Sequence, residues 1–137
     1  MGGPEIAPQP PQSAGLESAG VGGRGGVVAV VKDLFFVARI RETARLAEVP
    51  LTFARTAGEI AAALAAAPRF LLLDLTAGLD HDAILTAAHG AGVPVLAFTT
   101  HVLARQTQPW HGRCQRVVTK ETLTAELPTL LRGGVTT

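Results

Sequence analysis

Short runs of apolar residues without polar alternation restrict the fold more than any other feature of the chain. The clearest are Val27–Val31, Phe70–Leu75 (interrupted only by Asp74) and Val95–Phe98. A strand with one face in water alternates apolar with polar residues, whereas a strand covered on both faces is apolar throughout. These runs therefore predict strands of a parallel sheet with helices on both sides.

Segments with the apolar spacing of helices separate these strands. In residues 34–48 apolar residues recur at every third or fourth position, and Thr56 and Glu59 have the spacing of a capping box that opens a helix through Ala67. Further helices are expected over residues 82–91, 101–108 and 121–131. Pro109 predicts the end of the fourth helix, and Pro128 predicts a kink or a frayed final turn in the last one.

Two more strands, at residues 51–55 and 116–119, complete a pattern of five strands alternating with five helices. This order predicts an α/β fold, a (βα)5 three-layer sandwich around a five-stranded parallel sheet. Residues 27–132 form the predicted domain, while the Gly/Pro-rich residues 1–26 and the short segment 133–137 are expected to be tails. The glycines at 22–26 precede the first strand, so they do not form a dinucleotide-binding loop.

Composition bounds the function. A length of 137 residues suits one domain, and a net charge of +1 gives no reason to expect nucleic-acid binding. No apolar run approaches the roughly 20 residues that cross a bilayer, and no signal peptide is apparent. The single Cys114 excludes an internal disulfide. These features predict a cytoplasmic protein without a membrane partner.

Polar residues stand where four of the predicted strands end. They are Asp33, Asp74, Thr99 and Lys120. Because the carboxyl ends of parallel strands meet at one edge of the sheet, where ligands bind in open α/β folds, these side chains are expected to form one polar cluster.

In residue types and element order, residues 27–131 resemble the receiver domain of two-component response regulators, of the single-domain chemotaxis type. The resemblance implies a flavodoxin-like sheet in the order 2-1-3-4-5. It implies that Asp74 is the phosphoacceptor and that Thr99 and Lys120 contact the phosphoryl oxygens. It further implies Mg²⁺ as a cofactor, held by Asp33, Asp74 and the backbone carbonyl of Thr76.

The chain departs from the receiver pattern at several positions. Lys32 replaces one acid of the usual pair before the first helix, so a cation stands near the expected metal site, where it could pair with Asp33 or Asp74. Val117 replaces the usual aromatic switch residue, and Glu121 stands where a proline often follows the lysine. These departures predict a fold that is retained while regulated phosphorylation is degraded.

A stretch without acidic residues lies between Asp82 and Glu121. Its candidate partner-binding residues are Arg105, Trp110, Arg113 and Arg116. Receivers often use the face of the fourth helix and fifth strand to bind partners or to dimerise. We therefore expect this basic face to bind a signalling protein, either a histidine kinase or a downstream effector, or a second copy of the chain.

Three functions remain open from the sequence. The favoured hypothesis is a stand-alone pseudo-receiver that is not an enzyme and acts through protein–protein interaction. The alternative is a working phosphoacceptor in a phosphorelay, whose catalysis is limited to phosphorylation of its own Asp74 from a phosphohistidine donor with Mg²⁺. A third hypothesis, a flavodoxin-like domain that holds a small ligand, lacks a phosphate loop. The histidines and Cys114 do not have zinc-site spacing.

Overall fold

The computed structural model describes residues 26–133, in which every predicted strand and helix is present. The strands are β1 (Val27–Val30), β2 (Leu51–Phe53), β3 (Phe70–Asp74), β4 (Val95–Thr99) and β5 (Arg116–Thr119). The helices are α1 (Leu34–Ala47), α2 (Ala57–Ala65), α3 (His81–Gly90), α4 (Ala104–His111) and α5 (Lys120–Gly133). The predicted tails lie outside the described residues, apart from Gly26 and Gly133.

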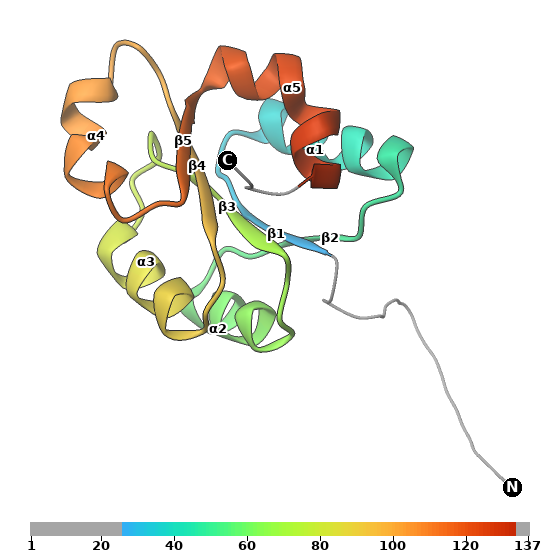
Figure 1. Ribbon diagram of the computed structural model, residues 1–137, viewed down its shortest axis with the longest axis horizontal. Helices are drawn as coiled ribbons and strands as arrows, with labels where there is room; N and C mark the ends of the chain where they lie inside the picture. The colour runs from blue at the N-terminus through green and yellow to red at the C-terminus, as the bar shows by residue number, and fades with distance from the viewer. Residues whose placement is uncertain (1–25, 134–137) are drawn as a thin grey trace, which may run out of the picture.

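The five strands form one parallel sheet in the order β2-β1-β3-β4-β5, which confirms the predicted fold class. Figure 1 shows α1 and α5 together on one face of the sheet and α2 and α3 together on the other. Along each apolar run, successive side chains point to opposite faces of the sheet and so contribute to both core layers. Leu72 packs under α1 and α5, while Leu71 and Leu73 pack under α2 and α3.

Side-chain caps fix where three helices begin. Asp33 accepts from the backbone N–H groups of Phe35 and Phe36 at the start of α1, and Asp80 accepts from Ala83 N at the start of α3. Thr56 and Glu59 form the predicted capping box at the start of α2. Each cap satisfies backbone donors that the first helical turn leaves without partners.

The fourth helix differs from its prediction. It begins at Ala104, after a turn over residues 101–103, and it continues through Pro109 to His111. Trp110 explains the extension, because its side chain packs against the core cluster beneath α3 and holds the last turn in place. The predicted stop at Pro109 was therefore wrong: tertiary packing outweighs the lost backbone donor.

The last helix ends at Gly133, close to its predicted end at residue 131, and the turn that follows Pro128 is helical instead of frayed. Leu127, Leu130 and Leu131 are almost completely buried against the α1 side of the sheet, so burial on both sides of the proline keeps the helix continuous. Within the described residues, no helix is both long enough and apolar enough to cross a bilayer.

Candidate functional site at the carboxyl edge of the sheet

The four predicted polar residues gather at the carboxyl edge of the sheet. Asp33 and Lys120 follow β1 and β5, whereas Asp74 and Thr99 are the last residues of β3 and β4. The register aligns Val30 with Leu73, Asp74 with Phe98 and Thr99 with Thr119, so the four strands end at nearly the same level. The structure thus brings these residues to one edge, but it connects them in a way that the sequence did not predict.

The carboxylate of the buried Asp74 accepts hydrogen bonds at one oxygen and not at the other. Its Oδ1 accepts hydrogen bonds from the backbone N of Thr76 at 2.8 Å and from Thr76 Oγ1 at 2.5 Å. No donor from residues 26–133 is within hydrogen-bond distance of Oδ2. Asp74 has only 3% of its surface exposed, and within the described residues its hydrogen bonds go to Oδ1 alone.

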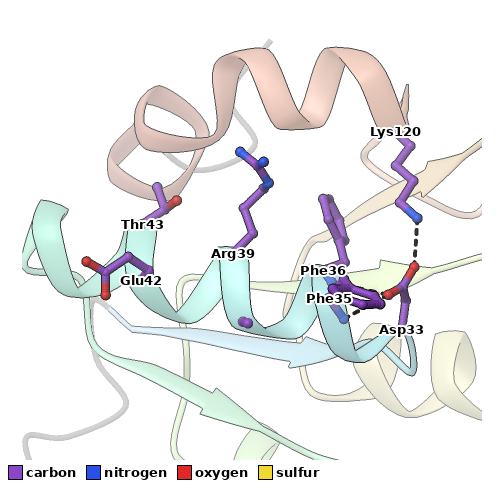
Figure 2. A pocket seen from close by; sticks show the side chains of 8 residues that line it. Asp33, Phe35, Phe36, Arg39, Glu42, Thr43 and Lys120 are labelled. Atoms are coloured by element: carbon purple, nitrogen blue, oxygen red, sulfur yellow. Dashed lines mark hydrogen bonds and ion pairs between the residues drawn. The ribbon is translucent and has the colours of Figure 1, made fainter.

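Lys120 is bound to Asp33. The Lys120 Nζ donates to Asp33 Oδ2 at 2.9 Å, while Asp33 Oδ1 accepts from the backbone N–H groups that begin α1 (Figure 2). The Lys120 hydrogen bond is the main cause that lowers the pKa of Asp33, followed by the backbone N–H of Phe36. Lys120 Nζ also lies 5.1 Å from the centre of the Phe36 ring.

Thr99 is directed into a different hydrogen-bond chain. Its Oγ1 lies 3.0 Å from Oγ1 of the buried Thr107, and that hydroxyl lies 2.8 Å from His111 Nε2. Thr107 Oγ1 also donates to the carbonyl of Ala104. Among the described residues, neither Thr99 nor Lys120 forms a hydrogen bond with Asp74.

Lys32 does not take the position that the sequence suggested. Its side chain is exposed and forms no ion pair with any residue from 26 to 133. The pairing of Lys32 with Asp33 or Asp74 that the sequence allowed is thus absent among the described residues, and it is Lys120 that reaches Asp33 from the start of α5.

The residues at this edge do not fit Mg²⁺ in the conformation described. Mg²⁺ needs oxygen ligands in near-octahedral geometry, usually one or two carboxylates with water. Here the Lys120 ammonium contacts the oxygen of Asp33 that a cation would need, and Thr76 donates to one oxygen of Asp74. The part of the chain that is described holds no cluster of three histidine, cysteine or acidic side chains around a cation position.

His81 contributes to the site, although the sequence gave no signal for it. The ring is buried, and its Nε2 lies 3.0 Å from the backbone carbonyl oxygen of Asp74. The same ring meets Trp110 edge-on, with ring centres 4.8 Å apart. His81 therefore links the end of β3 to α4. In the sequence His81 directly follows Asp80, which caps α3, and this position does not distinguish a buried histidine from an exposed one.

The basic face has less free charge in the structure than along the sequence. Arg113 forms an ion pair with Asp82 on α3, and Arg116 lies 3.8 Å from Glu126 on α5. Trp110 is half-buried in the core. Arg105 is exposed and has no ion pair within the described chain. The acids that balance this stretch come from neighbouring helices, so a scan along the sequence could not reveal them.

Cys114 is unsuited to act as a nucleophile. Burial raises the pKa of its thiol to about 11, and the Sγ donates to the carbonyl of Trp110. At neutral pH the thiol is protonated, and the thiolate is the reactive form of cysteine.

A groove of about 530 Å³, the Lys120 groove, opens beside the Asp33–Lys120 pair, between α1 and the start of α5 (Figure 2). Its lining includes Phe36, Arg39 and Thr43, and Figure 2 shows Arg39 extending from α1 toward α5. Phe35 stands at its end with 92% of its surface exposed. The preceding Leu34 is 68% exposed as well, so two successive large apolar side chains are exposed at the start of α1, and an exposed apolar patch marks a candidate binding surface.

Solved structures show which fold the chain adopts. It superposes on the receiver domain of the sensor histidine kinase PA1611 from Pseudomonas aeruginosa with a TM-score of 0.64 and 17% sequence identity. The superposition covers 82% of this chain and 98% of that receiver domain, whose structure contains a magnesium ion in the active-site cleft. A response regulator receiver domain from Rhodospirillum rubrum superposes with a TM-score of 0.56 and 20% identity, over 79% and 92% of the two chains.

A de novo designed Rossmann 2x3 protein matches almost as well, with a TM-score of 0.59 and 15% identity over 82% of this chain and 93% of the designed one. No protein-family model and no curated protein matches the sequence. The chain therefore has a receiver-like fold. Since a designed protein shares it, the similarity of fold does not assign a chemistry, which must come from the side chains at the site.

Proposed function

We propose that this chain with a receiver-like fold is a pseudo-receiver, a signalling domain that acts by binding another protein instead of by transferring a phosphoryl group. One observation supports the proposal most directly. The Lys120 ammonium is hydrogen-bonded to Asp33, and neither it nor the Thr99 hydroxyl contacts Asp74.

Charge explains why this arrangement favours a binding role. A carboxylate can attack a phosphoryl group only when cations neutralise the repulsion between the two anions. In this chain Lys120 and Asp33 neutralise each other, and Lys32 is exposed and has no acidic partner in the described chain. The internal ion pair thus replaces the metal that a phosphorylating receiver would recruit, and it holds one conformation without a ligand.

The proposed partner is another signalling protein, a histidine kinase or a downstream effector, that the chain meets in the cytoplasm. Two surfaces support this role. The basic face of α4 and β5 offers the exposed Arg105, and the start of α5 is flanked by Phe35 and by Val102, which is 85% exposed. Val102 follows His101, whose Nε2 lies 3.9 Å from Glu121 Oε1 near the beginning of α5.

Intact mass after incubation with Mg²⁺ and a small phosphodonor tests the proposal. We expect no added phosphoryl group on the native chain or on Asp74→Asn, while a phosphorylating receiver treated in parallel gains one. A gain of one phosphoryl group on the native chain alone, absent from Asp74→Asn, would overturn the pseudo-receiver proposal.

The second candidate is the working phosphoacceptor. It is favoured by Asp74 Oδ2, which accepts no hydrogen bond from the described residues, so its lone pairs are not used by the fold. For this function Lys120 must leave Asp33. Restoring the acidic pair with Lys32→Asp should strengthen Mg²⁺ binding, whereas detectable binding by the native chain is expected only of a phosphoacceptor. A Mg²⁺ titration followed by amide NMR measures both.

Partner binding is tested separately from phosphorylation. Arg105→Glu and Phe35→Ser should each weaken capture of the cellular partner at least about tenfold, because exposed aromatic and arginine residues dominate interface energies. Arg132→Glu, which reverses an exposed charge at the far end of α5, is the matched control. If all partners bind the Arg105 and Phe35 variants as tightly as the native chain, the proposed surfaces are wrong.

A further inference from the structure

A second cavity, of about 290 Å³, lies at the carboxyl edge of the sheet on the other side of β1 from the Lys120 groove. It is bounded by the end of β1 and the turn into α1, by the residues that follow β2, and by the loop between β3 and α3. The lining residues are Val30, Val31, Lys32, Leu34, Ala54, Arg55 and Leu79.

The topology gives this position a physical meaning. From β1 the chain continues into α1 on one face of the sheet, whereas from β3 it continues into α3 on the opposite face (Figure 1). The loops that follow β1 and β3 therefore diverge, and they leave a crevice between them. Open α/β sheets bind ligands in such crevices, outside the carboxyl ends of their strands.

The floor of the cavity is apolar. Val30 and Ala54 are each 1% exposed and lie at the base, and Leu79 and Leu34 contribute to the walls. Leu34 keeps 68% of its surface exposed, although it is a large aliphatic residue at the first position of α1. A ligand in the cavity would remove this apolar surface from water, which is favourable by roughly 25 cal/mol per Å².

Two cations line the same cavity, and no acid does. Lys32 and Arg55 are exposed and form no ion pair within residues 26–133. Glu59 lies beside Arg55, but its carboxylate accepts from the backbone N–H groups of Arg55 and Thr56 and serves the capping box of α2. Backbone hydrogen bonds from Arg55 and Thr56 are the main cause that lowers the pKa of Glu59, and the charge of Arg55 adds to it, so Glu59 partly balances Arg55. Neither Lys32 nor Arg55 is held in an ion pair among the described residues, so both side chains can turn toward a ligand.

We propose that this cavity binds a small organic anion, with its apolar body against Val30, Ala54 and Leu79 and its anionic group between Lys32 and Arg55. The volume is at the lower end of the range for small-molecule sites, so the ligand is a short-chain or single-ring acid. In this proposal Lys32, which takes no part in the Asp33–Lys120 ion pair, binds the ligand. The proposal is independent of whether the chain is a pseudo-receiver.

The test uses hexanoate as the probe on the full native chain, followed by amide NMR. We expect saturable shifts for residues 30–34, 54–55 and 79. Hexanol, which lacks the charge, and inorganic phosphate, which lacks the apolar chain, should bind more weakly. Lys32→Gln and Arg55→Gln should each weaken hexanoate binding about three- to tenfold, since each removes one charge-assisted contact.

Arg39→Gln is the matched control, because it removes an exposed cation from the Lys120 groove and leaves this cavity intact. Its affinity for hexanoate should equal that of the native chain. All three variants change exposed side chains, and their amide spectra report directly whether the fold is retained. The proposal is overturned if hexanoate does not bind, if hexanol or phosphate binds as tightly, or if only Arg39→Gln weakens binding.

Discussion

Asp33 shows how one side chain can hold a site and a helix at the same time. One carboxylate oxygen caps α1, and the other accepts from the Lys120 ammonium, which comes from a residue 87 positions away. The ion pair joins the first and last helices at the carboxyl edge of the sheet. Because the pair is partly exposed, its effect on stability depends on pH and on salt.

The first prediction concerns the pH dependence of Asp33→Asn, which keeps the cap and removes the charge. The pKa of Asp33 is lowered from 3.8 in the folded chain, mainly by Lys120, so the unfolded state binds the proton more readily. At a pH above 3.8 the native chain should be more stable than Asp33→Asn. This difference in the free energy of unfolding should disappear as the pH falls through the lowered pKa of Asp33 in the folded chain.

Urea unfolding of both proteins between neutral and acidic pH measures this difference. In a Lys120→Met background the Asp33→Asn change should have a smaller, less pH-dependent effect, since its main partner is gone. An equal effect in both backgrounds would show that the pair does not cause the pKa shift.

The second prediction concerns His81. His81→Ala removes the hydrogen bond to the Asp74 carbonyl and the edge-on contact with Trp110, so it should reduce the free energy of unfolding by about 1–3 kcal/mol. His89→Ala on the exposed face of the same helix should change it by less than about 0.5 kcal/mol. Similar losses for both variants in urea unfolding would contradict a structural role for the His81 contacts.

At the scale of the element, the sequence correctly predicted a helix start that depends on hydrogen bonds within the first turn. It misplaced a helix end that depends on packing against distant residues. The capping box at Thr56 and Glu59 is present as predicted, because all its partners lie within four residues. The end of α4 was misplaced, because Trp110 obtains its packing from residues distant in the sequence.

The third prediction belongs to α5. Pro128 lies inside this helix and is exposed, so Pro128→Ala supplies the missing N–H without disturbing the core. The substitution should raise the free energy of unfolding by about 1–3 kcal/mol. Thermal and urea unfolding measure the change. A loss of stability would mean that α5 needs the bend or the restricted backbone that proline imposes.

At the scale of the whole molecule, the stability rests on the two apolar layers that enclose the sheet. Leu72 is fully buried in β3 beneath α1 and α5. The fourth prediction is that Leu72→Ala costs about 2–5 kcal/mol of the free energy of unfolding, through lost burial and the cavity left behind. Leu46→Ala, which truncates a leucine that is 66% exposed, is the control and should cost far less.

The sequence alone determined the number and type of elements and the edge of the sheet where the polar residues meet. These follow from backbone periodicity, from the burial of apolar runs on both faces, and from the shared direction of parallel strands. Only the tertiary structure decided that Lys120 binds Asp33, that Thr99 joins Thr107, and that Lys32 faces a separate cavity with Arg55. Contacts of this kind depend on where side chains from distant segments meet in space, which periodicity along the chain does not encode.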